Sequence, residues 1–200
     1  MKTNPIRGMT SDEYLAFERA SEVKHEYLGG QIVAMGGAKR NHNTISTNLG
    51  GLVWQHLKGR DCESYSNDMR VHLPATSEYV YPDLSIVCGE PIFQDAVLDT
   101  LINPLLLVEI LSDSTEGYDR GLKFQLYRGI TSLREYILVS QDQPRIEKYT
   151  KQGDGFWMLS DAAGIESEIT LEPIQLIVRL SDVYDKVDFA YDDQSKVRPV

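Results

Sequence analysis

Leu-Leu-Leu-Val-Glu-Ile-Leu, residues 105–111, is the stretch that decides the fold. This short apolar run is compatible with a β-strand and predicts a central strand covered on both faces. Glu109 interrupts the run, and an ionised, unpaired carboxylate inside a buried strand would cost several kcal/mol. We therefore expect Glu109 to be neutral, ion-paired or bound to a metal.

A second acidic residue stands at the start of another predicted strand, Tyr-Pro-Asp-Leu-Ser-Ile-Val (81–87). Asp83 follows Pro82, which cannot donate to a sheet hydrogen bond and so marks the first residues or the edge of a strand. If the two strands are neighbours, Asp83 and Glu109 can reach one cleft, with the carbonyl oxygen of Ile110 as a third ligand. Hard divalent cations take oxygen ligands and need only one or two protein carboxylates. This set predicts a Mg²⁺ site, with Mn²⁺ as an alternative.

The segments around these strands alternate between helical and strand patterns. Capping residues and apolar spacing predict helices over about residues 10–20, 41–57 and 118–128, the last with Leu122 and Leu126 on one face. Turn and strand signals predict a hairpin of 24–28 and 31–35, and strands over 62–66, 69–73, 84–88, 105–111, 135–140, 146–150 and 156–159. The strand, helix, strand order after Glu109 is a crossover unit. We therefore expect an α+β (α/β) fold: a mixed β-sheet flanked by helices, with an extra N-terminal hairpin and C-terminal antiparallel strands.

Length and composition favour one domain. Two hundred residues with 42% apolar content can bury one core of ordinary size but not two, so we expect one domain over residues 1–190 and a polar tail over 191–200. The N-terminus lacks an apolar leader and no run reaches the length of a membrane span, so we expect a cytoplasmic protein without a membrane partner. Cys62 and Cys88 have no metal-site spacing, and we expect both thiols to be reduced.

The formal net charge of −10 argues against a protein that coats nucleic acid, because affinity for phosphates comes from Lys and Arg. Twelve acidic residues and one basic residue lie between positions 61 and 119, the segment that contains Asp83 and Glu109. Most of these acids are expected on a solvated surface. Together they would attract a dication and repel a polyanion, which leaves open a separate partner that supplies a DNA-targeting surface.

Three further side chains are candidates for the chemistry. Lys123 lies one to two turns into the helix after Glu109 and can reach back to orient an attacking water, unless it is a surface lysine paired with Asp119 at i, i+4. Tyr127, on the same face, can bind a phosphate or pack as an edge aromatic. His42 begins the second helix, where it can meet a phosphate at the positive helix end or have only a structural role.

These residues also carry a resemblance to a known family. The landmarks are His-Glu-Tyr-Leu-Gly-Gly-Gln-Ile-Val (25–33), the helix opening with His42, Pro-Asp-Leu-Ser-Ile-Val (82–87), Val-Glu-Ile-Leu-Ser-Asp-Ser-Thr (108–115), Tyr118-Asp119 to Lys123 and Tyr127, and Glu-Tyr-Ile-Leu-Val (135–139). In this order and spacing, the chain from about Thr10 to Phe189 resembles the Uma-two family of restriction-endonuclease-like proteins, which belongs to the PD-(D/E)XK nuclease superfamily.

The resemblance implies a restriction-endonuclease-like core, a metal-binding Asp at Asp83 and the acidic member of the (D/E)XK pair at Glu109. The usual lysine of the superfamily would fall at Leu111, so its role passes to Lys123 on the following helix. Glu26 matches an acidic position in the first hairpin of the family and is a candidate ligand or water-orienting group. The implied activity is a magnesium-dependent endonuclease with DNA as substrate.

Three hypotheses from different classes stay open. The favoured one is the DNA endonuclease, and a homodimer suits it because cutting both strands of a duplex at once takes two active sites. The second is a catalytically silent nucleic-acid-binding or partner-binding protein on the same scaffold, motivated by the acidic surface and the apolar Leu111. The third is a metal-dependent enzyme on a small phosphorylated metabolite, although no phosphate-cradling glycine loop supports it.

Overall fold

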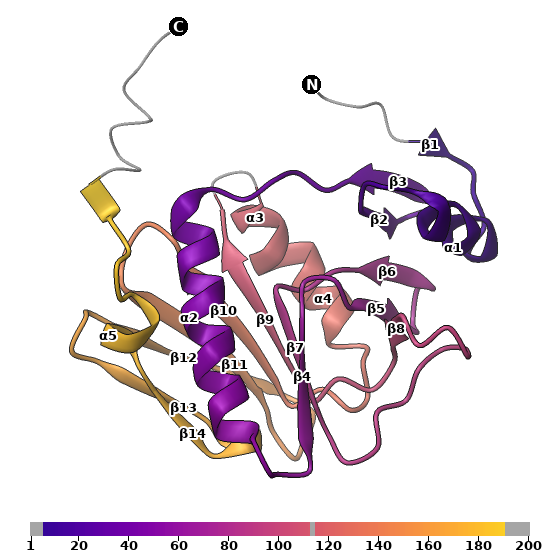
Figure 1. Ribbon diagram of the computed structural model, residues 1–200. Helices are drawn as coiled ribbons and strands as arrows, with labels where there is room; N and C mark the ends of the chain where they lie inside the picture. Colours follow the sequence, from indigo (N-terminus) through magenta and orange to yellow (C-terminus); the bar gives the residue numbers. More distant parts are fainter. Residues whose placement is uncertain (1–5, 113–114, 191–200) are drawn as a thin grey trace, which may run out of the picture.

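A mixed six-stranded sheet holds the strand of Glu109 near its centre (Figure 1). The structure is a computed structural model and describes residues 6–112 and 115–190. The strands are Cys62–Ser66 (β4), Leu84–Cys88 (β7), Leu106–Leu111 (β9), Glu135–Ser140 (β10), Arg145–Lys151 (β11) and Trp157–Ala163 (β12), in the order β12-β11-β10-β9-β7-β4. β9 is parallel to β10, and the other neighbours are antiparallel. The expected crossover and mixed sheet are therefore confirmed.

Helix α2 (Arg40–Leu57) lies across one face of this sheet (Figure 1). Its buried apolar residues recur every four positions, as an amphipathic helix requires: Ile45, Leu49, Val53 and Leu57. They form one core cluster with the side chains of Val108 and Ile110 from β9. Because side chains alternate along a strand, Glu109 points to the other face of β9, where Leu107 and Leu111 belong to a second core cluster.

A short composite helix covers that other face. It consists of α3 (Glu116–Tyr118), the π-helical segment η1 (Asp119–Lys123) and α4 (Phe124–Tyr127). Leu122, expected on an apolar face with Leu126, is 52% exposed, whereas Asp119 and Lys123 are buried. The helix therefore turns polar side chains toward the sheet and toward Glu109. Single π-helical turns of this kind are frequent at functional sites.

A second, smaller sheet lies beside the first and carries the N-terminal hairpin (Figure 1). Its strands are Ile6–Arg7 (β1), His25–Leu28 (β2), Gln31–Ala34 (β3), Arg70–Leu73 (β5), Glu78–Val80 (β6) and Thr100–Leu101 (β8). The expected hairpin is β2–β3, and Gly29 and Gly30 make its turn with φ of 56° and 74°. Helix α1 (Ser11–Ala20) packs on this sheet and starts with the expected capping box of Thr10 and Glu13.

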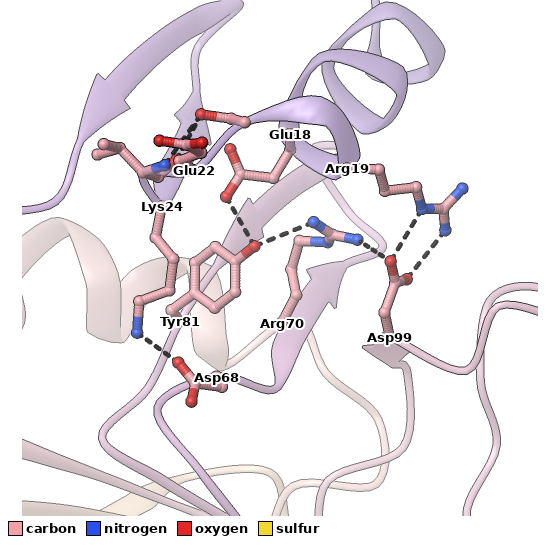
Figure 2. A pocket seen from close by; sticks show the side chains of 10 residues that line it. Glu18, Arg19, Glu22, Lys24, Asp68, Arg70, Tyr81 and Asp99 are labelled. Carbon is pink, nitrogen blue, oxygen red and sulfur yellow. Dashed lines mark hydrogen bonds and ion pairs between the residues drawn. The ribbon is translucent and has the colours of Figure 1, made fainter.

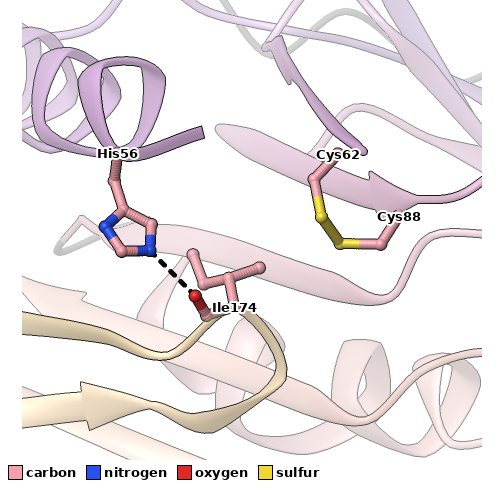
Figure 3. Close-up of a disulfide and its surroundings, with 4 residues drawn as sticks. All are labelled: His56, Cys62, Cys88 and Ile174. Atoms are coloured by element: carbon pink, nitrogen blue, oxygen red, sulfur yellow. Dashed lines mark hydrogen bonds between the residues drawn. A yellow bond between two sulfur atoms is a disulfide. The ribbon is translucent and has the colours of Figure 1, made fainter. Parts of the chain in front are cut away.

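The C-terminal segment completes the core on the α2 side. It contains β13 (Glu168–Leu171), the 3₁₀ turn η2 (Glu172–Ile174), β14 (Leu176–Arg179) and α5 (Leu180–Val183). The His56 ring nitrogen Nε2 lies 2.8 Å from the carbonyl oxygen of Ile174, which ties α2 to this segment (Figure 3).

The two cysteines form a disulfide, so the expectation of reduced thiols was wrong (Figure 3). Cys62 and Cys88 lie directly opposite each other on the antiparallel pair β4–β7. Strand pairing brings together residues that are 26 positions apart, and neither the number nor the spacing of the cysteines reveals that register. The bond joins the edge strand of the main sheet to the strand that follows Asp83.

Some expectations lie outside the described residues: the polar tail over 191–200, and Asp113 and Ser114 of the motif that follows β9. Within residues 6–112 and 115–190, each helix is too short or too polar to traverse a lipid bilayer.

A buried polar cluster lies where the first residue of β10, Glu135, meets β11 and η2. Lys148 pairs with Glu172, donates to the carbonyl oxygen of Thr170 at 2.6 Å and lies 3.5 Å from Glu135. Burial raises the pKa of Glu135 to about 8, and a hydrogen bond with Glu172 adds to the rise. The folded protein therefore keeps Glu135 protonated in a pH range where the unfolded chain ionises it.

Glu135→Gln should change how stability depends on pH. Because the folded-state pKa of Glu135 is raised, its contribution to stability is complete below the unfolded value near 4.5 and is lost as pH rises through about 8. Three pH units of this shift correspond to roughly 4 kcal/mol, so the melting temperature of the variant should gain roughly 8–16 °C relative to the wild type between about pH 5 and pH 9. Thermal unfolding across this range checks it, and a constant difference would contradict it.

Candidate active site

The two acidic residues predicted to share a site lie at the same end of two adjacent strands, Glu109 on β9 and Asp83 directly before β7. β7 pairs with β9 so that Leu84 lies opposite Val108, and the same register places Asp83 opposite Glu109. Asp83 Oδ2 accepts a hydrogen bond of 2.7 Å from the backbone N–H of Ile110. The chain thus brings together two carboxylates that are 26 residues apart in sequence.

Ile110 contributes its backbone while its side chain packs against α2. The N–H and C=O of one strand residue point toward the same neighbouring strand. Since the N–H of Ile110 points to Asp83, its carbonyl oxygen lies on the Asp83 side as well. The three predicted oxygen ligands therefore lie at one end of the β7–β9 pair.

Lys123 is the cation of the site. Only 4% exposed, it holds its Nζ 2.8 Å from Glu109, 3.3 Å from Glu26 and 3.6 Å from Asp119. The π-helical turn of η1 places Lys123 and Asp119 on the side that faces β9. The alternative of a surface lysine is wrong, although the expected contact with Asp119 is present.

Tyr127 and His42 each contact one of the two central carboxylates. Tyr127 is completely buried, and its hydroxyl donates to Glu109 Oε1 at 2.6 Å. The phosphate contact expected for Tyr127 does not fit this position, because the side chain orients Glu109 and does not reach the cleft. His42 Nε2 lies 3.3 Å from Asp83 Oδ2, so the first turn of α2 reaches the site as expected.

Glu26 reaches the site from strand β2 of the smaller sheet. Besides Lys123, its Oε1 accepts a weak hydrogen bond of 3.4 Å from the backbone N–H of Tyr81. The Tyr81 hydroxyl is held between Arg70, which donates to it at 3.0 Å, and Glu18, which accepts from it at 2.9 Å (Figure 2). Tyr81 precedes Pro82 and Asp83, so this network fixes the backbone that carries Asp83.

Glu18, Arg70 and Tyr81 also line a separate pocket of about 260 Å³ (Figure 2). Its charges compensate one another: Arg19 and Arg70 pair with Asp99, and Lys24 pairs with Asp68. Because these charged groups already have partners, we assign this pocket a structural role and place the chemistry in the larger cleft.

The central site holds more negative than positive charge. Burial raises the pKa of Glu109 well above its ordinary value; Lys123 opposes the rise, and Asp119 and Asp83 reinforce it. Burial also raises the pKa of Asp119. Burial alone would lower the pKa of Lys123, but Glu109, Glu26 and Asp119 raise it well above normal. The ammonium of Lys123 cannot balance all four carboxylates of the cleft, so the site favours additional positive charge. The four are those of Glu26, Asp83, Glu109 and Asp119.

A cleft of about 880 Å³ contains the candidate residues of the site. Its lining includes Glu26, His42, Asp83, Glu109, Ile110, Asp119 and Lys123. No group of three or more His, Cys, Asp or Glu side chains in the described ranges has the geometry of a metal site. The predicted site has only two such side chains, the carboxylates of Asp83 and Glu109, and takes its third ligand from a backbone carbonyl. It still fits Mg²⁺, which usually keeps several waters and binds one or two carboxylates.

Sequence reasoning missed three residues of the cleft. Asp119 was considered only as an alternative partner of Lys123, and its i, i+4 spacing was the signal that could have found it. Tyr118 precedes η1, and its ring centre lies 5.7 Å from Lys123 Nζ. Gln141 follows β10 and lines the same cleft. Tyr118 belongs to the landmark Tyr118-Asp119, which gave it no role, and no local pattern marks Gln141, because its place in the cleft depends on the tertiary fold.

Lys123→Met should destabilise the protein because it leaves buried carboxylates without their counter-charge. We expect a loss of about 3–5 kcal/mol in the free energy of unfolding near neutral pH. The loss should shrink as the pH falls, since the raised pKa of Glu109 and of Asp119 favours their protonation, and adding Glu109→Gln should restore part of it. Urea unfolding measures both effects. Lys186→Met, at a lysine that is 83% exposed, is the control; equal losses in the two variants would contradict the assignment.

Comparisons with known proteins bear on the family and the fold of this chain. A family model, Uma2, described as "Putative restriction endonuclease", matches residues 11–180. Two proteins of Synechocystis sp. (strain ATCC 27184 / PCC 6803 / Kazusa) are similar in sequence. "Uncharacterized protein slr1290" is 41% identical over 155 residues, 78% of this chain and 80% of its own length. "Uncharacterized protein sll1609" is 37% identical over 161 residues, 80% and 91% respectively.

A solved structure shares the fold. The crystal structure of "a putative nuclease belonging to DUF820" from Anabaena variabilis ATCC 29413 matches with a TM-score of 0.72 and 17% identity, covering 88% of this chain and 98% of the other. This likeness confirms the expected restriction-endonuclease-like fold. Because the family match spans most of the sequence and the relatives align over nearly four fifths of it, this chain belongs to the Uma2 family of restriction-endonuclease-like proteins.

Proposed function

We propose that this protein is a metal-dependent endonuclease that hydrolyses DNA phosphodiester bonds. The observation that carries the proposal is that Asp83, directly before β7, and Glu109 on β9 line one cleft, with Lys123 Nζ 2.8 Å from Glu109. Membership of a family described as restriction endonucleases supports DNA as the substrate.

Each residue of the site has a role that its position supports. Asp83, Glu109 and the Ile110 carbonyl would hold Mg²⁺ or Mn²⁺ through oxygen atoms, which these ions prefer. When bound, the ion supplies an acidified water and offsets negative charge on the phosphodiester. Lys123 orients the attacking water, and Glu26 keeps the Lys123 ammonium in place at 3.3 Å.

His42 and Tyr127 act through the carboxylates. The contact of His42 with Asp83 holds the α2 end of the cleft next to the reacting phosphate. The hydrogen bond from Tyr127 fixes one oxygen of Glu109, so that the other oxygen remains for the ion. Because the chain is acidic, with a net charge of −10, we further propose that a second copy or a separate DNA-targeting partner adds to the affinity for duplex DNA.

A catalytically silent nucleic-acid-binding protein is the second candidate. One observation favours it: Lys123 already neutralises Glu109 at 2.8 Å, so Glu109 has a counter-charge without an ion. The two candidates differ in whether the carboxylates are needed for DNA to be cut or only for the fold.

Asp83→Asn and Glu109→Gln should each abolish cleavage. With supercoiled plasmid and single-stranded DNA, we expect the wild type to cut in Mg²⁺ or Mn²⁺ but not in EDTA, and each variant to be slower by roughly 100-fold or more. Glu166→Gln, at an exposed acid in the turn before β13, is the matched control and should cut like the wild type. Cleavage that survives both active-site substitutions would contradict the proposal.

Magnesium should stabilise the folded protein through the same carboxylates. Binding at one hundred times the dissociation constant adds about 2.7 kcal/mol, or roughly 5–10 °C in melting temperature for a domain of this size. The effect should be larger near pH 8 than near pH 6, because the ion competes with the protons that the raised pKa of Glu109 retains. Thermal unfolding with NaCl of matched ionic strength is the control, and an equal shift in Asp83→Asn would argue against this site.

A further inference from the structure

Three buried polar groups that line the active cleft make no hydrogen bond within the described residues. They are Nδ1 of His42, the hydroxyl of Tyr118 and Oε1 of Gln141. Leaving a buried polar group unsatisfied costs about 1–3 kcal/mol, and native proteins tolerate few such groups. Three in one cleft, from three separate segments of the chain, indicate groups that are satisfied when a ligand is bound.

Of the three residues, Gln141 is the one whose burial and place in the sheet point most directly to a ligand. Its side chain is only 3% exposed. It follows Ser140, which pairs with Leu111 on the parallel strands β9 and β10, so Gln141 stands at the carboxyl ends of both strands. Ligands of open sheets with parallel strands bind at this end. Glu109 lies two residues before that end on β9.

Tyr118 reaches the same cleft from the composite helix. Its ring centre lies 5.7 Å from Lys123 Nζ. The phenol ring is therefore next to the ammonium proposed to orient the attacking water. His42 uses Nε2 for its contact with Asp83, so only Nδ1 remains for another partner. The three unsatisfied groups therefore line the same cleft as the carboxylate pair.

The chemistry of these groups favours a ligand recognised by neutral hydrogen bonds. The Tyr118 phenol can donate and Gln141 Oε1 can only accept, so the pair suits base edges, which offer both acceptors and donors, and the phenol also suits a phosphate oxygen. The cleft measures about 880 Å³, within the range of about 300–1,000 Å³ that holds small ligands. A few nucleotides of one strand fit such a cleft, whereas a base-paired duplex would first have to open.

We propose that Tyr118 and Gln141 form a subsite that binds a single DNA strand beside the phosphodiester to be cut. The inference rests on the proposed nuclease function, because the carboxylate cleft supplies the reaction. Neither residue holds the metal. Each acts by fixing the nucleotide next to it.

Binding and melting together test the subsite. The probe is a fluorescein-labelled single-stranded DNA of twelve nucleotides and the duplex of the same sequence, both in Ca²⁺, followed by fluorescence anisotropy. The wild type should bind the single strand more tightly than the duplex. Tyr118→Phe and Gln141→Leu should each weaken single-strand binding by roughly 10-fold, with melting temperatures equal to or above that of the wild type, since each removes an unsatisfied buried group.

Ser85→Ala is the matched control. The Ser85 hydroxyl is also buried and unsatisfied within the described residues but does not line the cleft, so this variant should keep wild-type binding. Unchanged binding by both cleft variants, equal binding of duplex and single strand, or lower melting temperatures that track the lost binding would each overturn the proposal. If the variants lose single-strand binding while plasmid is never cut, the subsite stands and only the proposed activity fails.

Discussion

The attraction between the buried ammonium of Lys123 and the carboxylates around it is the interaction on which the structure depends. A buried charge is stable only with partners, and Lys123 finds Glu109, Glu26 and Asp119 within 3.6 Å. These partners come from β9, from the N-terminal hairpin and from the helix of Lys123 itself. The ion pairs therefore hold the two sheets and the composite helix at one point, and that point is the cleft.

The same interaction leaves the site unbalanced, and this imbalance connects stability with function. Burial raises the pKa of Glu109 and Asp119 because one ammonium cannot neutralise all the acids. A protein selected only for stability would replace such a cluster with apolar residues at little cost. Retaining it makes sense if a divalent cation supplies the missing charge, and the oxygen ligands at the end of the β7–β9 pair provide a place for one.

The sequence predicted the centre of the molecule better than its periphery. Glu109 in an apolar run and Asp83 after Pro82 were identifiable because each violates a local expectation for a strand. The disulfide and the very short strands β6 and β8 were not, since pairing partners distant in the chain determine them. The inward side of the composite helix was also misjudged: apolar spacing pointed to Leu122, but a site with buried charges reverses the usual rule. Gln141 depends on tertiary position alone.

A crystal structure of the protein grown with Mn²⁺, with an anomalous difference map, tests the central claim most directly. The account predicts an anomalous peak bonded to the carboxylates of Asp83 and Glu109 and to the Ile110 carbonyl oxygen, with Lys123 Nζ beside it. A cleft in which Lys123 keeps its contact with Glu109 and no Mn²⁺ binds, while the ion occupies a site elsewhere, would contradict it.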